Sequence, residues 1–237
     1  MNIDNPQEEL YSQMSSLLDS LSVLHLPFYD DFKTKWRDIL YSNTMNPLIR
    51  AAEYTSESQL YTTEVSFASG FKFPLHFDIS NILRNYQKET KYKKPVFFYP
   101  FQLKVQGNKK LTLNSHPCAY NYTSREEREE SYNTHDPIFV SLMPLIPHSF
   151  FVVDGNHRVS ALVDKKEKSI DVLLIEPNCA PCFMISSAEM VAYTLMLDVF
   201  IIMDAIKSRN VSGLREKLSV FNDKSMLSTL KETERLR

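Results

Sequence analysis

The five residues from Asp154 to Arg158, in the order Asp, Gly, Asn, His, Arg, combine the side chains of this sequence best suited to chemistry. The aromatic and β-branched run Phe150 to Val153 comes directly before them, as in a buried strand. Apolar residues then recur between Val159 and Val163 at the spacing of one helical face. The pattern therefore predicts a strand, a tight turn at the glycine, and a helix that begins within two residues of Asn156.

Each residue of this turn has a chemical use. Gly155 permits a positive φ, and Asp154 or Asn156 can cap the first helical amides. His157 and Arg158 fall in the first turn, where free N–H groups and the helix dipole favour an anion such as phosphate. The chain has only 4 Gly, which favours a special purpose for one at this junction. An ordinary strand-to-helix turn with an Asn cap explains the same residues equally well.

This motif resembles the signature of the ParB/sulfiredoxin-like superfamily, Gly-x-His-Arg or Asp-Gly-x-His-Arg. The flanks are similar as well: Pro137 to Met143 resembles the family strand before the motif, and Ile170 to Ile175 the strand after its helix. The resemblance covers roughly Lys94 to Pro177, about a third of the chain. It implies an α/β (α+β) core in which nucleotide phosphates rest on the helix that starts near Asn156.

The resemblance implies a nucleoside triphosphate, ATP or CTP with Mg²⁺, as the ligand. The amides of Gly155, Asn156 and His157 would hold phosphate, Arg158 would neutralise it, and His157 would add a hydrogen bond or act as an acid. Such chemistry depends mainly on positioning and charge stabilisation.

A general base and the metal ligands are not evident in the motif itself. Asp154 is the first acid-base candidate, and His135 and Asp136 are the others nearby. One family activity is excluded, because sulfiredoxins place their catalytic Cys immediately before the His-Arg pair and Asn156 stands there in this chain.

Three functions stay open at the level of the sequence. The first is phosphoryl transfer or nucleoside triphosphate hydrolysis. The second is a DNA-associated partition-like or nuclease-like role, and the third is a non-catalytic regulatory module that has kept the fold.

Composition indicates an ordinary globular protein of 237 residues, 43% hydrophobic and 24% charged, with a formal net charge of −2. That charge argues against a dedicated nucleic-acid binder with a basic surface throughout. The first residues lack the features of a signal peptide, and three Cys make a poor disulfide framework, so we expect a cytoplasmic protein. Cys179 and Cys182 have redox spacing but are expected to be ordinary buried or half-buried thiols.

The chain is expected to form three sections: an N-terminal helical section (1–66), the core (67–182) with a polar insertion at 114–136, and C-terminal helices (183–237). Helical spacing predicts helices over residues 6–24, 28–40 and 48–60. The polar insertion is expected to be an exposed helix or lid, and Lys104 to Leu111 a hairpin around Gly107-Asn108.

Ser186 and Glu189 have capping-box spacing at the start of a long apolar helix, Met190 to Ile206. Two acids make it a poor membrane span, so we expect it at the centre of the fold or at the core of a homodimer. Asp198 inside it needs a hydrogen-bonding partner, such as an Arg.

One stretch is basic: Arg84 to Lys110 holds eight Lys or Arg and one acid, Glu89. It is either a phosphate-tracking surface with stacking aromatics or a solvated helix end and hairpin. The second interpretation is favoured, because the lysines of a helix and a hairpin need not share a face.

Overall fold

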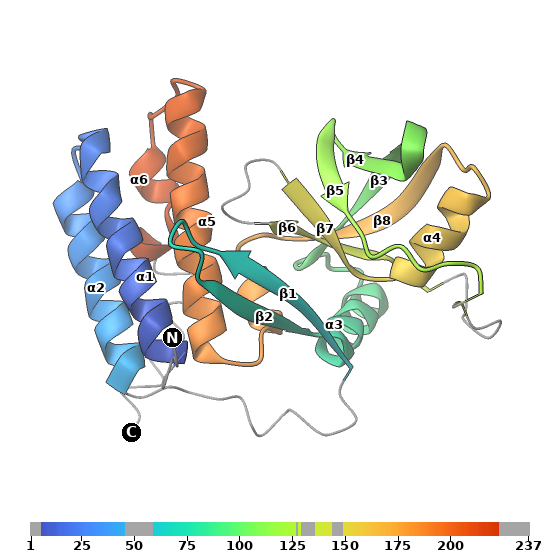
Figure 1. The fold of residues 1–237 in the computed structure, drawn as a ribbon, viewed down its shortest axis with the longest axis horizontal. Helices are drawn as coiled ribbons and strands as arrows, with labels where there is room; N and C mark the ends of the chain where they lie inside the picture. The colour runs from blue at the N-terminus through green and yellow to red at the C-terminus, as the bar shows by residue number, and fades with distance from the viewer. Residues whose placement is uncertain (1–5, 46–58, 127, 129–135, 144–148, 223–237) are drawn as a thin grey trace. The chain divides into compact units, whose positions relative to one another are not determined.

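The structure is a computed structural model of the chain and describes residues 6–45, 59–126, 128, 136–143 and 149–222. It combines helices and strands, an α+β fold whose main sheet is a closed six-stranded barrel (Figure 1). The chain forms two compact units. Unit 1 contains Met1–Asp78 and Pro181–Arg237, and unit 2 contains Ile79–Ala180.

Three helices pack together in unit 1: α1 (Pro6–Ser20), α2 (Tyr29–Met45) and α5 (Ser187–Lys207). The first two confirm the helices predicted over 6–24 and 28–40, and a short 3₁₀ turn, Leu21–Leu24, lies between them. The predicted helix over 48–60 falls mostly outside the described residues. The 3–4 spacing of α1 and α2 places five side chains at zero exposure: Leu10, Met14, Leu18, Phe32 and Trp36.

Helix α5 covers the segment predicted to be helical, and most of it is buried. Ser186 caps it by accepting a hydrogen bond from Glu189 N at 3.2 Å. The Glu189 carboxylate does not close the capping box. It accepts a hydrogen bond from His76 N at 3.0 Å, in strand β2 (Lys72–Asp78), and lies 2.9 Å from His76 Nδ1. No helix in the described part of the chain has the length and apolarity to cross a membrane.

Asp198 lies fully buried in α5 and is hydrogen-bonded, as the sequence predicts. Its partners are not an Arg but three N–H groups: Ser219 N at 2.6 Å, Trp36 Nε1 at 3.1 Å and Val220 N at 3.2 Å. The two backbone donors belong to the 3₁₀ turn Ser219–Phe221, which follows the short helix α6 (Leu214–Lys217). Burial raises the pKa of Asp198 to about 6. The same chain covers this part of α5, so its burial requires no second copy.

A two-stranded antiparallel sheet completes unit 1, formed by β1 (Leu60–Ser66) and β2 (Lys72–Asp78). Strand β1 was not predicted, because its residues Leu-Tyr-Thr-Thr-Glu alternate only weakly in polarity. The hairpin joins residues 67–78 to unit 1, whereas the predicted core began at residue 67. The N-terminal and C-terminal sections, predicted as separate, share this unit because α1 and α2 pack on α5.

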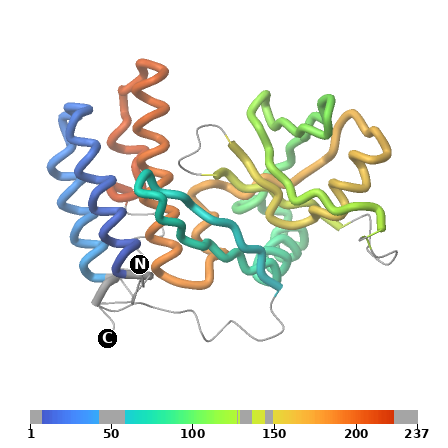
Figure 2. Tube along the Cα trace, viewed as in Figure 1, coloured from blue at the N-terminus to red at the C-terminus, as the bar shows by residue number. Residues whose placement is uncertain are grey.

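Unit 2 is built around the barrel, in which the strand order is β3-β4-β5-β7-β6-β8 and β8 closes on β3 (Figures 1 and 2). The strands are β3 (Phe98–Gln106), β4 (Lys110–Leu113), β5 (His116–Ala119), β6 (Phe139–Met143), β7 (Ser149–Asp154) and β8 (Ser169–Ile175). The β5–β7 and β6–β8 pairs are parallel and the others antiparallel. Helix α3 (Ile79–Tyr92) precedes the barrel, and α4 (Asn156–Asp164) connects β7 to β8.

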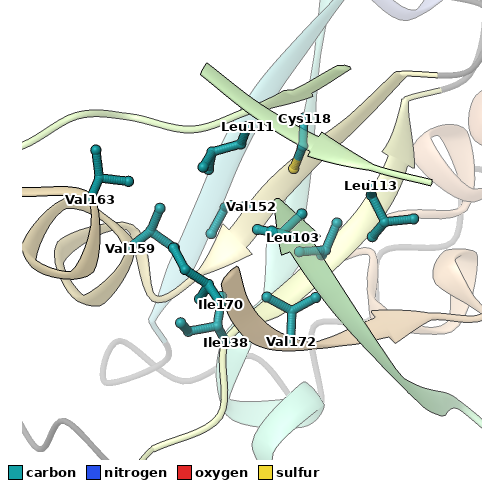
Figure 3. Packing of buried hydrophobic residues seen from close by; sticks show 11 residues of the cluster. Leu103, Leu111, Leu113, Cys118, Ile138, Val152, Val159, Val163, Ile170 and Val172 are labelled. Atoms are coloured by element: carbon teal, nitrogen blue, oxygen red, sulfur yellow. The ribbon is translucent and has the colours of Figure 1, made fainter. Parts of the chain in front are cut away.

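The core of unit 2 is apolar and draws on every barrel strand and on one face of α4 (Figure 3). Val159 and Val163, one helical turn apart, bring α4 onto this cluster beside Val152 of β7 and Ile170 of β8. Helix α3 contributes the Tyr86 ring, which meets Phe98 and Phe139 edge to face. Burial of these side chains fixes the strand-to-helix turn on a rigid support.

Two local predictions for this unit need correction and one is confirmed. The aromatic and β-branched run after Lys94 predicts a strand over Lys94 to Tyr99, but β3 begins only at Phe98, because residues 94–96 are exposed. The polar insertion 114–136 starts with a barrel strand, β5, and residues 120–126 form no helix; residues 127 and 129–135 lie outside the described part. The hairpin at Gly107 is confirmed: β3 and β4 pair across the turn Gly107–Lys109.

Candidate anion-binding site at the start of α4

The predicted strand, turn and helix are confirmed at the motif. Strand β7 ends at Asp154, Gly155 adopts φ 96° and ψ 18°, and α4 begins at Asn156. A Cβ on Gly155 would lie 2.9 Å from both Ile138 Cγ1 and Arg158 Nη2. Gly155 is therefore required for two reasons: a left-handed backbone and the absence of space for a side chain.

The predicted caps are wrong. Neither Asp154 nor Asn156 caps α4: the N-cap position is Gly155, and among the described residues no side chain accepts a hydrogen bond from the first turn. Asp154 is engaged by Arg158 instead. Asn156 is already the first helical residue, where its Oδ1 accepts from Asn121 N at 2.8 Å and its Nδ2 donates to Val152 O at 3.3 Å. The amides at the start of α4 are thus left for water or a ligand.

Arg158 is not a free cation. Its Nη2 donates to Asp154 Oδ2 at 3.0 Å and to Pro137 O at 2.9 Å, and its Nη1 lies 3.5 Å from Asp136 Oδ2. Its side chain is 11% exposed, and its buried Nε has no partner among the described residues. Asp154 is 20% exposed but Asp136 is 53% exposed, so Asp136 is the weaker and more accessible of the two partners.

The other candidate residues are less closely associated. His157 is exposed, and no contact joins it to another candidate in the described part of the chain. His135 lies outside the described residues, and only its neighbour Asp136 is brought to the motif.

A cleft of about 960 Å³ adjoins Arg158 within unit 2. Asp136 and Pro137, both partners of Arg158, line it, and so does Leu162, one turn after Arg158 on the same face of α4. Side chains of Tyr86 and Phe101 lie along the cleft with those of the following polar residues: Gln102, Glu167, Ser169 and Asp171. It therefore offers flat apolar surface together with hydrogen-bond acceptors.

A polar row on α4 was not predicted from the sequence. It is formed by Asn156, Ser160 and Asp164, each four residues after the last. Ser160 Oγ accepts from Thr123 N at 3.0 Å, as Asn156 does from Asn121 N, and Asp164 accepts from Tyr122 Oη at 3.1 Å. The row holds residues 121–123 along the helix. Its i, i+4, i+8 spacing is visible in the sequence, but its partners are not.

The described residues do not provide a dedicated metal site, since no group of three His, Cys, Asp or Glu side chains among them is arranged to hold an ion. The two carboxylates at the motif, Asp136 and Asp154, are shared with Arg158. Cys179 and Cys182 are half-buried and unlinked, as expected, and burial of Cys118 raises the pKa of its thiol to about 12, so it is no nucleophile.

Comparison of the chain with protein-family models, curated proteins and solved structures finds no match. Only the Asp154 to Arg158 motif and its flanking strands therefore carry the resemblance to the ParB/sulfiredoxin-like superfamily.

Proposed function

We propose that unit 2 is a ParB/sulfiredoxin-like core that binds the phosphate of a nucleotide at the start of α4. The observation that supports this most is the turn itself: a left-handed Gly155 opens an uncapped helix while Arg158 packs against it. Backbone N–H groups and a guanidinium at one point are the combination that phosphate requires.

Arg158 would bind phosphate by exchanging one carboxylate for the ligand. Asp154 keeps the guanidinium in place at 3.0 Å, and the exposed Asp136, at 3.5 Å, is the partner that phosphate oxygens displace. A guanidinium already fixed by Asp154 loses little rotational freedom on binding, which favours affinity.

The cleft is the natural place for the nucleoside. Tyr86 and Phe101 offer surface for a base, and the amide and carboxylate of Gln102 and Asp171, 2.8 Å apart, offer polar groups to its edge. The acids that line the cleft disfavour phosphate there, so the phosphates belong at the α4 end.

Phosphoryl transfer or hydrolysis is the activity that we propose for this site. His157, exposed in the first turn of α4, is the acid, and Asp136, once displaced from Arg158, is the better base because Asp154 stays engaged. The described residues do not fit a protein-held Mg²⁺ site, and no step is assigned to the ion.

Thermal-shift and calorimetric titration with ATP, CTP and GTP tests the proposal. Arg158→Ala should weaken binding by roughly 2 to 4 kcal/mol, as loss of one member of a desolvated charge pair does. Asp136→Asn should tighten binding, because it removes the carboxylate that competes with phosphate for Arg158.

Arg215→Ala, which removes an exposed ion pair with Asp31 in unit 1, is the matched control and should leave binding unchanged. If no nucleotide binds, or if Arg158→Ala binds as tightly as the parent, the phosphate site is wrong. Binding without turnover would leave a regulatory module.

A further inference from the structure

Six exposed lysines gather at one end of the barrel, away from the motif, and we call them the lysine patch. Three belong to the β3–β4 hairpin and three to the turn between α4 and β8. The members are Lys104, Lys109, Lys110, Lys165, Lys166 and Lys168.

The two turns are direct neighbours (Figure 2). Lys104 pairs with Ser169 in the β3–β8 ladder, and Val105 N donates to Lys168 O at 3.0 Å. Lys109 Nζ reaches across to Asp164, the last residue of α4, at 3.1 Å. Residues more than 50 positions apart in the sequence therefore form one surface, which neither stretch reveals alone.

Charge on this surface is concentrated. Lys109 is paired with Asp164, but in the part of the chain that the structure describes none of the other five patch lysines has an ion pair. Unit 2 as a whole has 14 Lys or Arg against 11 Asp or Glu in residues 79–180, although the entire chain has a net charge of −2. The excess of acid therefore lies in unit 1, and the overall charge does not describe this surface.

Both turns hold a lysine in the left-handed region: Lys109 at φ 59° and Lys166 at φ 60°. Asn or Gly would fit these positions with less strain, so lysine in either turn carries a cost in backbone strain. Lys109 is further fixed by its ammonium, which lies 3.7 Å from the centre of the Tyr122 ring. Tyr122 is 45% exposed and its hydroxyl donates to Asp164, which holds the ring at the edge of the patch.

We propose that the lysine patch, with Tyr122, binds the backbone of a single-stranded nucleic acid. Closely spaced ammonium groups follow successive phosphates, and an exposed, immobilised tyrosine provides a face for an unpaired base. A duplex leaves no base face free for Tyr122, and the patch exposes no large aliphatic side chain for insertion into a membrane. The patch adjoins Asp164 at the last turn of α4, whereas the proposed phosphate site lies at its first turn.

The test is the salt dependence of binding to a fluorescent oligo-dT strand by the whole protein. The variant Lys104→Gln/Lys110→Gln/Lys168→Gln should weaken binding at least roughly tenfold and lower the log–log salt slope by about 2, at about 0.7 per phosphate contact. The matched control is Lys88→Gln/Lys91→Gln/Lys94→Gln, which makes the same charge change at exposed lysines in and just after α3. It should bind nearly as the parent does.

The base contact has its own pair of variants. Tyr122→Phe keeps the ring and should keep the preference for oligo-dT over duplex DNA, whereas Tyr122→Leu should lose most of it. Equal loss in both triple variants would indicate non-specific attraction and overturn the proposal. The proposal would also be overturned if the parent bound duplex DNA or polyglutamate as tightly as it binds oligo-dT. Thermal shifts by mononucleotides should be the same in the lysine variants and the parent, which separates this surface from the α4 site.

Discussion

At the scale of single residues, the motif depends on what surrounds Gly155 and Arg158 more than on their own properties. Gly155 has Ile138 and the Arg158 guanidinium within 3 Å of the place where a Cβ would stand. Arg158 is held by one half-buried and one exposed carboxylate, and in the proposed site phosphate would displace the exposed one. The contacts that shape the turn are therefore the contacts that a bound phosphate would change.

Gly155→Ala should destabilise the protein more than Gly70→Ala. Both glycines have a left-handed φ, 96° and 86°, so backbone strain is nearly matched at about 1 kcal/mol. Nothing lies within 4 Å of a Cβ at Gly70, whereas the crowding at Gly155 should add about 1 to 3 kcal/mol. Urea unfolding followed by circular dichroism measures both; equal losses would show that the crowding at Gly155 relaxes freely.

Asp198 should make unit 1 less stable as the pH rises from about 4 to about 6. Its pKa in the folded state, about 6, lies above its ordinary value of 3.8, so the folded protein retains a proton that the unfolded chain releases. Protonated Asp198 therefore contributes at most about 3 kcal/mol to the free energy of unfolding. This contribution is complete below about pH 4 and is lost above about pH 6.

Comparison with Asp198→Asn isolates this effect. The variant places an NH₂ group against N–H donors and should be less stable than the parent by about 2 to 4 kcal/mol at pH 4. The deficit should shrink by up to about 3 kcal/mol at pH 7, because only the parent loses stability between the two pH values. Trp36, the single Trp of the chain, is buried beside Asp198 and reports unfolding by fluorescence. A deficit that does not change with pH would mean that the carboxyl does not titrate in this range.

At the scale of elements, α4 has two faces with separate tasks. Val159 and Val163 face the barrel core, and the row Asn156, Ser160 and Asp164 holds residues 121–123. The first turn of α4 and the position of residues 121–123 are therefore linked through Asn156, which takes part in both the motif and the row.

Ser160→Ala should loosen this segment without unfolding the helix. Thr123 N loses its acceptor at 3.0 Å, a loss of about 1 kcal/mol, so its amide should exchange with solvent roughly fivefold to tenfold faster. Hydrogen exchange resolved by NMR measures this, with Leu173 N, bonded to Ile138 O at 2.8 Å, as the internal control. An unchanged Thr123 amide would show that Asn156 and Asp164 suffice.

Local patterns in the sequence predicted individual helices and strands. They could not predict contacts between side chains that lie far apart in the sequence. The apolar run Phe150 to Val153 predicted the strand, and Gly155 predicted the turn, because each pattern lies within a few consecutive residues. The pairing of Arg158 with Asp136 and of Asp198 with Trp36 joins residues 22 and 162 positions apart, and no spacing rule connects them. Strand β5, at four residues, is too short to show a period.

At the scale of the whole molecule, the two units differ in the number of chain segments that form them. Unit 2 is one continuous stretch with its own apolar core, whereas unit 1 needs segments from both sides of it. Stability measured by the Trp36 fluorescence therefore describes unit 1, and the barrel needs a different probe.

A fragment of residues 79–180 should fold alone and melt cooperatively, because its barrel closes and its core is internal. A fragment of residues 1–78 should not, since α1 and α2 lose α5, and Trp36 loses its buried acceptor Asp198. Circular dichroism melts of both fragments decide this. A disordered 79–180 fragment would show that the barrel depends on the rest of the chain.

The interrupted layout of unit 1 has a consequence for synthesis on the ribosome. Helices α1 and α2 emerge before the barrel, but α5, against which they pack, follows only after about 140 further residues, a wait of roughly 7 to 28 seconds at about 5 to 20 residues per second. The barrel can be complete by then, so the segment made first is the segment finished last. During that interval the apolar face of α1 and α2 is exposed to chaperones, and nascent chains halted after residue 180 should bind them and should release them once α5 has emerged.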